Sequence, residues 1–237
     1  MTLQNTLRTE ARLAGLIYLV IVITGIFALG YIPSQIGGSG DTNAMLQHLR
    51  DMVPLFKLGA VAFMAMQVAF IILPLQLYRL FHKINPAQAT LMVVFALCSI
   101  PTGLIALAEK LTILSLATNP NLAALGPQQV VNAAQLALIR YDNALFVTTL
   151  FWGLWLLPFG GLVYRSGFIP RVLGVLLILG GFSYLVDMFS GWIWPAYAGS
   201  LAANLVTLPA SLGEFGICLW LLVIGVRAPK APPPVAA

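Results

Sequence analysis

The stretch that decides the fold is residues 150–187, LFWGLWLLPFGGLVYRSGFIPRVLGVLLILGGFSYLVD. One apolar run ends at Tyr164, a short basic turn follows, and a second apolar run begins after Pro170. Each run belongs to a segment of about 20 residues or more, the length that a helix needs to cross the hydrocarbon core of a bilayer. Proline suits the first turn of a helix. The stretch therefore predicts two membrane-spanning helices joined by a tight turn.

The same pattern recurs along all 237 residues, of which 60% are hydrophobic and only 8% are charged. Six segments are long and apolar enough to span a membrane, namely residues 12–32, 55–81, 87–116, 133–164, 170–192 and 203–227. The first is longer than the apolar region of a signal peptide, so we expect it to be retained. We predict an all-α, polytopic six-helix transmembrane bundle that forms one domain over residues 1–227. The Pro/Ala-rich residues 228–237 are predicted to be a disordered tail.

The basic residues predict the orientation of the helices. Eight of them fall on one side of a six-helix topology: Arg8, Arg12, Arg79, Lys83, Arg165, Arg171, Arg227 and Lys230. On the other side, residues 117–130 and 193–202 contain no charged residue. Because loops rich in lysine and arginine stay in the cytoplasm, both termini are predicted to be cytoplasmic. This topology also explains the net charge of +5 without a nucleic-acid partner.

The segment after the first span has a different pattern. Residues 37–40, GGSG, predict a flexible joint, after which Asp41 or Thr42 can cap a short helix. Apolar residues then recur at spacings of three and four, which predicts a helix lying flat in the outer interface. These residues are Met45, Leu46, Leu49, Met52 and Val53. The alternative is a lid over an outward-facing pocket.

Two carboxylates lie deep in the predicted spans. With a rise of about 1.5 Å per residue, Glu214 lies roughly 20 Å and Asp187 about 25 Å from the cytoplasmic boundary. Their short side chains cannot reach water easily, so each is expected to face the bundle and find a partner. We predict that they line an interior polar cavity open to the outside. The alternative is a buried ion pair that fixes the packing of the helices.

Further polar residues complete the predicted site. By the same count, Glu109, Lys57 and Asp142 lie about 33–35 Å up, near the outer interface. This group, which includes Lys110 and Arg140, can reach the outer interface by snorkelling, so its members are expected first of all to be solvated helix ends. A place in the polar site is the other interpretation of these residues. The full set of predicted ligand-binding residues is Glu214, Asp187, Glu109, Lys110, Lys57, Arg140, Asp142 and Gln67.

Several kinds of chemistry lack their sequence signatures. The two histidines, His48 and His82, lie outside the predicted spans and cannot hold a haem between helices. Cys98 and Cys218 lie within apolar spans and have no metal-binding spacing. We therefore predict no cofactor and no metal, and the sequence identifies no catalytic residue.

Several segments resemble one bacterial membrane family. They are residues 11–19 (ARLAGLIYL), 77–80 (LYRL), 164–174 (YRSGFIPRVLG), 180–187 (GGFSYLVD) and Glu214 ahead of 220–222 (WLL). Together they resemble the family called domain of unknown function 4386. The resemblance implies a six-helix protein of the bacterial inner membrane, in which Asp187 and Glu214 match polar positions of the family. Gln67 stands where the family implies an acid in the second helix.

Three hypotheses of function remain open at this point. The first is a protein that binds or moves a small or lipid-like molecule in an outward-facing polar pocket between helices. The second is an intramembrane enzyme acting on a lipid or isoprenoid, with one carboxylate as general acid or base. The third is an accessory subunit whose charges pair with another membrane protein.

Overall fold

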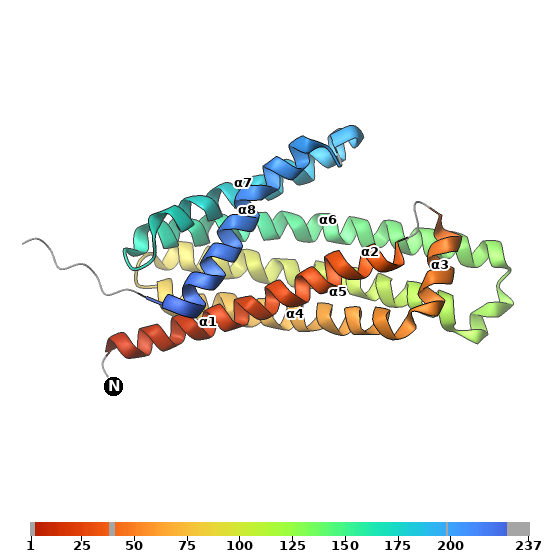
Figure 1. The fold of residues 1–237 in the computed structure, drawn as a ribbon, viewed down its shortest axis with the longest axis horizontal. Helices are drawn as coiled ribbons and strands as arrows, with labels where there is room; N and C mark the ends of the chain where they lie inside the picture. Colours follow the sequence, from red (N-terminus) through yellow and green to blue (C-terminus); the bar gives the residue numbers. More distant parts are fainter. Residues whose placement is uncertain (1–2, 38–40, 198, 227–237) are drawn as a thin grey trace, which may run out of the picture. The chain divides into compact units, whose positions relative to one another are not determined.

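The computed structural model describes residues 3–37, 41–197 and 199–226, and the regular elements of this part are all helical. Six helices are long and apolar enough to cross a membrane (Figure 1). They are Asn5–Ile36, Val53–Phe81, Pro86–Thr118, Pro127–Ser166, Arg171–Ile193 and Leu201–Ile224. The six predicted spans are thus confirmed, and the chain is an all-α, multi-span membrane protein. The predicted tail, most of the GGSG joint, Arg227 and Lys230 lie outside the described residues.

Three elements make up the first span. Helix α1 (Leu3–Gly25) continues without a break into the π-helix η1 (Ile26–Tyr31) and then into α2 (Ile32–Ile36). Helix α3 (Thr42–Asp51) follows as a separate short helix. The Asp41 side chain caps it by accepting hydrogen bonds from the backbone N–H groups of Asn43 and Ala44. The predicted short helix and its cap are therefore confirmed.

The remaining elements alternate long helices with short connections. Helices α4 (Val53–Phe81) and α5 (Pro86–Thr118) are joined by residues 82–85, and α5 leads through the 3₁₀ turn η2 (Pro120–Ala124) to α6 (Pro127–Ser166). Helix α7 (Arg171–Ile193) is followed by the 3₁₀ turn η3 (Pro195–Tyr197), α8 (Leu201–Leu219) and the π-helix η4 (Trp220–Ile224). Pro86 is the first residue of α5, and Pro170 is the N-cap residue that precedes α7.

The chain divides into two compact units. The first contains the described parts of residues 1–17, 73–94 and 153–237. The second contains the described parts of residues 18–72 and 95–152. Helices α1, α4, α5 and α6 contribute residues to both units, whereas α7 and α8 belong to the first and α3 to the second.

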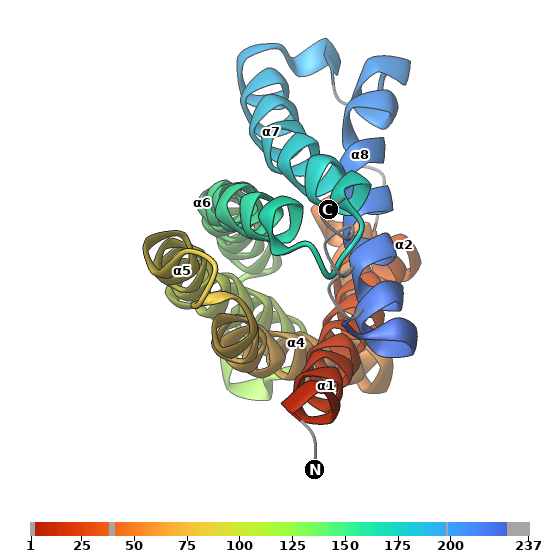
Figure 2. The same ribbon diagram turned by 90° about the vertical axis from the view of Figure 1, so that its left-hand side faces the viewer.

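In the first unit, α7 and α8 lie side by side (Figures 1 and 2). Small residues allow this close approach. A Cβ atom added at Gly180 of α7 would lie 2.7 Å from the Cα atom of Ala210 on α8. One added at Gly213 would lie 3.0 Å from the backbone of Leu176. Since helix association in lipid depends on van der Waals packing, these glycines hold the pair together.

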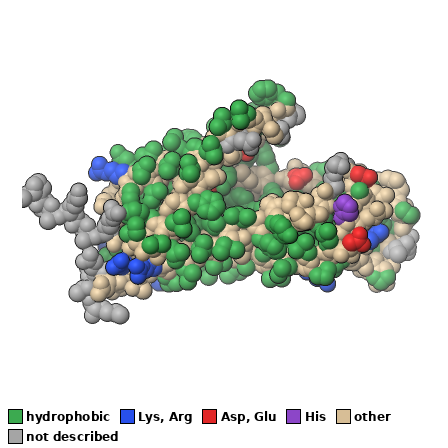
Figure 3. Space-filling model, in the orientation of Figure 1, with side chains coloured by type: hydrophobic (Ala, Val, Ile, Leu, Met, Phe, Trp, Pro, Cys, Tyr) green, Lys and Arg blue, Asp and Glu red, His purple; other side chains and the backbone are tan. Residues whose placement is uncertain are grey.

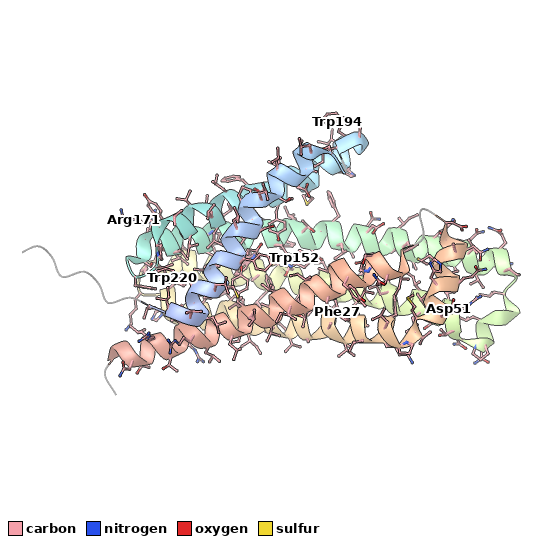
Figure 4. The ribbon with its side chains drawn as sticks, in the orientation of Figure 1. Phe27, Asp51, Trp152, Arg171, Trp194 and Trp220 are labelled. Atoms are coloured by element: carbon pink, nitrogen blue, oxygen red, sulfur yellow. The ribbon has the colours of Figure 1, made fainter. Side chains whose placement is uncertain are left out.

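The surface agrees with a membrane environment. Hydrophobic side chains occupy large areas of the helical surface visible in Figure 3, where charged side chains are few. At the end of α7, Trp194 is 64% exposed and lies at the far end of the helix from Arg171 (Figure 4). Exposed apolar helices of this length are stable in lipid because each helix satisfies its own backbone hydrogen bonds.

Candidate functional site

The second unit contains a cavity of about 160 Å³ between α3 and the helices around it. The lining residues come from α2, α3, α4, α5 and α6, together with Gly37. They are Ile32, Pro33, Ile36, Gly37, Met45, Leu49, Phe56, Lys110, Ile113, Leu138 and Tyr141. The walls are thus almost entirely apolar, and Lys110 is the charged side chain among them.

Helix α3 covers this cavity with the apolar face that the sequence predicted. Leu46 and Leu49 are 2% and 1% exposed, and they belong to one apolar cluster with residues of α2, α4, α5 and α6. Outside this face, the Arg50 Nε atom donates to the Ala117 carbonyl of α5 at 2.9 Å. The end of α3 is marked by Asp51 in Figure 4. The apolar face of α3 therefore packs against other helices of the second unit.

Lys110 places its ammonium group inside the unit. The residue is 9% exposed, and Nζ lies 4.9 Å from the ring centroid of Tyr141 and 5.8 Å from that of Phe63. Aromatic faces attract a cation through their quadrupoles. Nζ also donates a hydrogen bond to the Ala28 carbonyl at 3.2 Å. Among the described residues, Lys110 makes no ion pair.

The π-helix η1 explains why the Ala28 carbonyl is available to Lys110. The Ile32 N–H donates to the Phe27 carbonyl, five residues back, so the helix has changed register at this point. In the same register, the Ala28 carbonyl would accept a hydrogen bond from the backbone N–H of residue 33. Residue 33 is a proline, which has no backbone N–H. Lys110 supplies the missing donor. Single π-helical turns are frequent at functional sites.

The other predicted residues of the second unit do not line the cavity. Arg140 and Glu109 form an ion pair at 4.0 Å, with the arginine side chain 60% exposed. Lys57 and Asp142 are exposed. Pairs of this kind contribute about 0–1 kcal/mol to stability.

Gln67 is buried in the second unit, between α4 and α5. It is 2% exposed, and its Nε2 atom donates to the Ile100 carbonyl at 3.3 Å. The side chain lies against Gly103, where a Cβ atom would come within 2.9 Å of the Gln67 Cδ atom. The Oε1 atom is buried and has no hydrogen-bond partner among the described residues. Gln67 thus links two helices and is absent from the cavity lining.

Glu214 and Asp187 belong to the first unit, on the α7–α8 hairpin. The Tyr184 hydroxyl of α7 donates to the Glu214 Oε1 atom of α8 at 2.9 Å. Asp187 lies one turn beyond Tyr184, near the buried Tyr197 of η3. Burial raises the pKa of the Tyr197 hydroxyl, and the neighbouring Asp187 carboxylate raises it further. Tyrosines therefore accompany both carboxylates within this unit.

A second hollow, of about 430 Å³, lies on the first unit along the end of α7. Its lining consists of residues from that helix end: Leu185, Val186, Phe189, Ser190, Ile193 and Trp194. Neither Asp187 nor Glu214 belongs to this lining. A hollow on the side of one apolar helix is expected to be filled by lipid.

The hydrogen bond between Tyr184 and Glu214 should couple α7 to α8. We expect a double-mutant cycle with Tyr184→Phe and Glu214→Gln to give a coupling energy of about 0.6 kcal/mol, the average for interhelical hydrogen bonds in a membrane protein, and no more than about 1.7 kcal/mol. The measurement is reversible unfolding in mixed micelles for the wild type, both single variants and the double variant. Strictly additive effects would show that the two side chains do not interact.

Lys110 was among the residues predicted from the sequence, whereas the groups that surround its ammonium group were not. Tyr141, Phe63 and the Ala28 carbonyl come from three different helical segments. For Ala28 a signal existed, because Pro33 deprives a carbonyl in the preceding helical turn of its donor. Within the described ranges, no three His, Cys, Asp or Glu side chains are close enough to hold a metal ion.

Comparisons with known proteins place the chain in a family. Curated proteins and solved structures give no significant match. The family model of the domain of unknown function DUF4386 matches residues 13–225, which includes both units and all six candidate spans in whole or large part. The chain therefore belongs to the DUF4386 family of proteins of unknown function.

Proposed function

We propose that this membrane protein binds a small or lipid-like molecule in the cavity beneath α3. The observation that carries the proposal is the cavity itself, an apolar space of about 160 Å³ with one ammonium group in its wall. An engineered apolar cavity of about 150 Å³ is large enough to bind benzene. Binding sites for small molecules typically combine apolar walls with a few polar groups that orient the ligand.

The position of α3 supports the same proposal. A binding site within a helical bundle needs an entrance, and short helices that pack across the ends of longer ones can provide one by moving. Helix α3 covers the cavity with Met45 and Leu49, and the Arg50 side chain donates a hydrogen bond from this helix to α5. Of the eight residues predicted from the sequence, Lys110 is the one that lines the cavity and thus belongs to the proposed site.

Filling the cavity tests the proposal. In the variant Leu138→Trp, a larger side chain on α6 would occupy the space. The control is Leu136→Trp, since Leu136 is exposed on the same helix. Native mass spectrometry of protein extracted in a mild detergent should show a small molecule bound in fixed ratio to the wild type and to Leu136→Trp. It should be lost from Leu138→Trp, and equal retention by all three proteins would contradict the proposed site.

We further propose that both termini face the cytoplasm of a bacterial cell and that α3 lies on the outer side of the inner membrane. The distribution of basic residues supports this orientation, since Lys83 lies in the turn between α4 and α5, whereas residues 117–130 carry no charge. Single cysteines at Lys83 and Asn121, in a background with Cys98 and Cys218 replaced by serine, provide the test. A membrane-impermeant maleimide should label position 121 on intact spheroplasts and position 83 only after permeabilisation. The opposite pattern would reverse the orientation.

A further inference from the structure

We infer that the molecule bound beneath α3 is a monoanion with a compact apolar group, and that its anionic group pairs with Lys110. This inference rests on the proposed function and adds the chemical class of the ligand. The surroundings of Lys110, the size of the cavity and the chemistry of its walls support this ligand class.

The first step concerns charge. Lys110 is 9% exposed, and the described part of the chain provides it with a carbonyl oxygen and two aromatic faces but no carboxylate. Removing an ammonium group from water without supplying an opposite charge costs a large amount of free energy. Charged side chains within membrane spans are rare for this reason and usually belong to functional sites. A bound anion would supply the missing charge.

The second step concerns hydrogen bonds. A lysine ammonium group has three N–H donors. One of these donors binds the Ala28 carbonyl. The others can donate to an acceptor atom of a ligand. Tyr141 also lines the cavity, and its hydroxyl group makes no hydrogen bond with any described residue. A carboxylate could accept from both groups, and its single charge would match that of Lys110.

The third step concerns the apolar part of the ligand. The remaining walls are provided mainly by aliphatic side chains and Phe56. A volume of about 160 Å³ suits an aromatic ring or a short branched chain better than a long hydrocarbon chain. The same chemistry, a carboxylate attached to an apolar group, occurs in small carboxylic acids and in free fatty acids. The volume favours the small acids.

Three probes test this inference on the full chain in maltoside micelles by isothermal titration calorimetry. Sodium benzoate combines a carboxylate with an aromatic ring, methyl benzoate is its neutral counterpart, and laurate represents a lipid source. We expect benzoate to bind the wild type and Lys110→Met to weaken its binding by at least about tenfold. Lys110→Arg should retain more affinity than Lys110→Met. The control Lys57→Met removes an exposed lysine and should leave the affinity unchanged.

The outcomes separate this inference from the proposed function. Binding of benzoate or laurate that depends on Lys110 supports the inference, and laurate displacing benzoate with higher affinity identifies a lipid source. If methyl benzoate binds as tightly as benzoate, and only Leu138→Trp abolishes both, the cavity holds neutral molecules. The inference is then overturned while the proposed function stands. Failure of all three probes also overturns it, whereas the proposed function is decided separately by the molecule that native mass spectrometry detects.

Discussion

Replacing Lys110 with methionine is expected to raise the free energy of unfolding of the ligand-free protein, by an amount on the order of the 1–4 kcal/mol gained when buried ion pairs are replaced by apolar side chains. The reason is the buried ammonium group, which has one carbonyl and two aromatic rings as partners and no carboxylate among the described residues. Methionine is similar in length, flexible and apolar, so it can fill the same space among apolar neighbours. The variant should therefore be more stable and yet fail to bind an anion.

Equilibrium unfolding in mixed micelles measures this effect, with the protein freed of ligand by extensive exchange. Lys57→Met is the matched control, because Lys57 is exposed and its replacement should change stability by about 0.5 kcal/mol or less. A loss of stability in Lys110→Met would give the ammonium group a structural role, namely the satisfaction of the Ala28 carbonyl. A gain of stability in Lys110→Met would show that the ammonium group lowers the stability of the ligand-free protein. Such a cost is common at functional sites, where activity and stability conflict.

Gly15→Ala is expected to destabilise the first unit by about 3 kcal/mol or more, at the upper end of the range for overpacked sites. Within this unit, α1 lies directly against η4. A Cβ atom at position 15 would lie 2.6 Å from the Leu222 Cα atom and 2.7 Å from the Leu221 carbonyl carbon. These are backbone atoms, so no side chain can rotate away to make room. The contact is further fixed by Arg12, whose Nη2 atom donates to the Val223 carbonyl at 2.9 Å.

Gly30→Ala is the control for this substitution. A Cβ atom at position 30 would meet nothing within 4 Å, so alanine should be neutral there or stabilise the helix by up to about 1 kcal/mol. Unfolding of both variants in mixed micelles, compared with the wild type, gives the two effects. If Gly15→Ala changed the free energy of unfolding no more than Gly30→Ala, this result would contradict the close packing of α1 on η4.

The fold was largely predictable because lipid imposes simple rules. A segment of about 20 apolar residues in a membrane has little choice but to form a helix. The predicted segments agree with the six observed helices apart from their ends. The largest difference is in the first span, where helical structure begins at Leu3 and continues to Ile36. Apolar length alone does not indicate such extensions, since polar residues continue a helix beyond the hydrocarbon core.

The site was predictable only in part, because the sequence draws attention to charges and not to their surroundings. Lys110 was among the predicted residues, but so were Lys57 and Asp142, which are exposed. What distinguishes Lys110 is its position among Phe63, Tyr141 and the Ala28 carbonyl. Those groups are distant in sequence, and their meeting depends on how the helices of the second unit pack. The roles predicted for Glu214 and Asp187 stay predictions, with Tyr184 added as a partner of Glu214.

The central claim is that the cavity beneath α3 holds an anion at Lys110, and crystals grown with 4-bromobenzoate test it most directly. Anomalous scattering locates the bromine atom without reference to any assumed pose. We expect one bromine peak within the cavity, beside Ile113 and Leu138, with the carboxylate within about 4 Å of the Lys110 Nζ atom. A cavity without bromine in crystals that hold the probe elsewhere, or a carboxylate directed away from Lys110, would contradict the account.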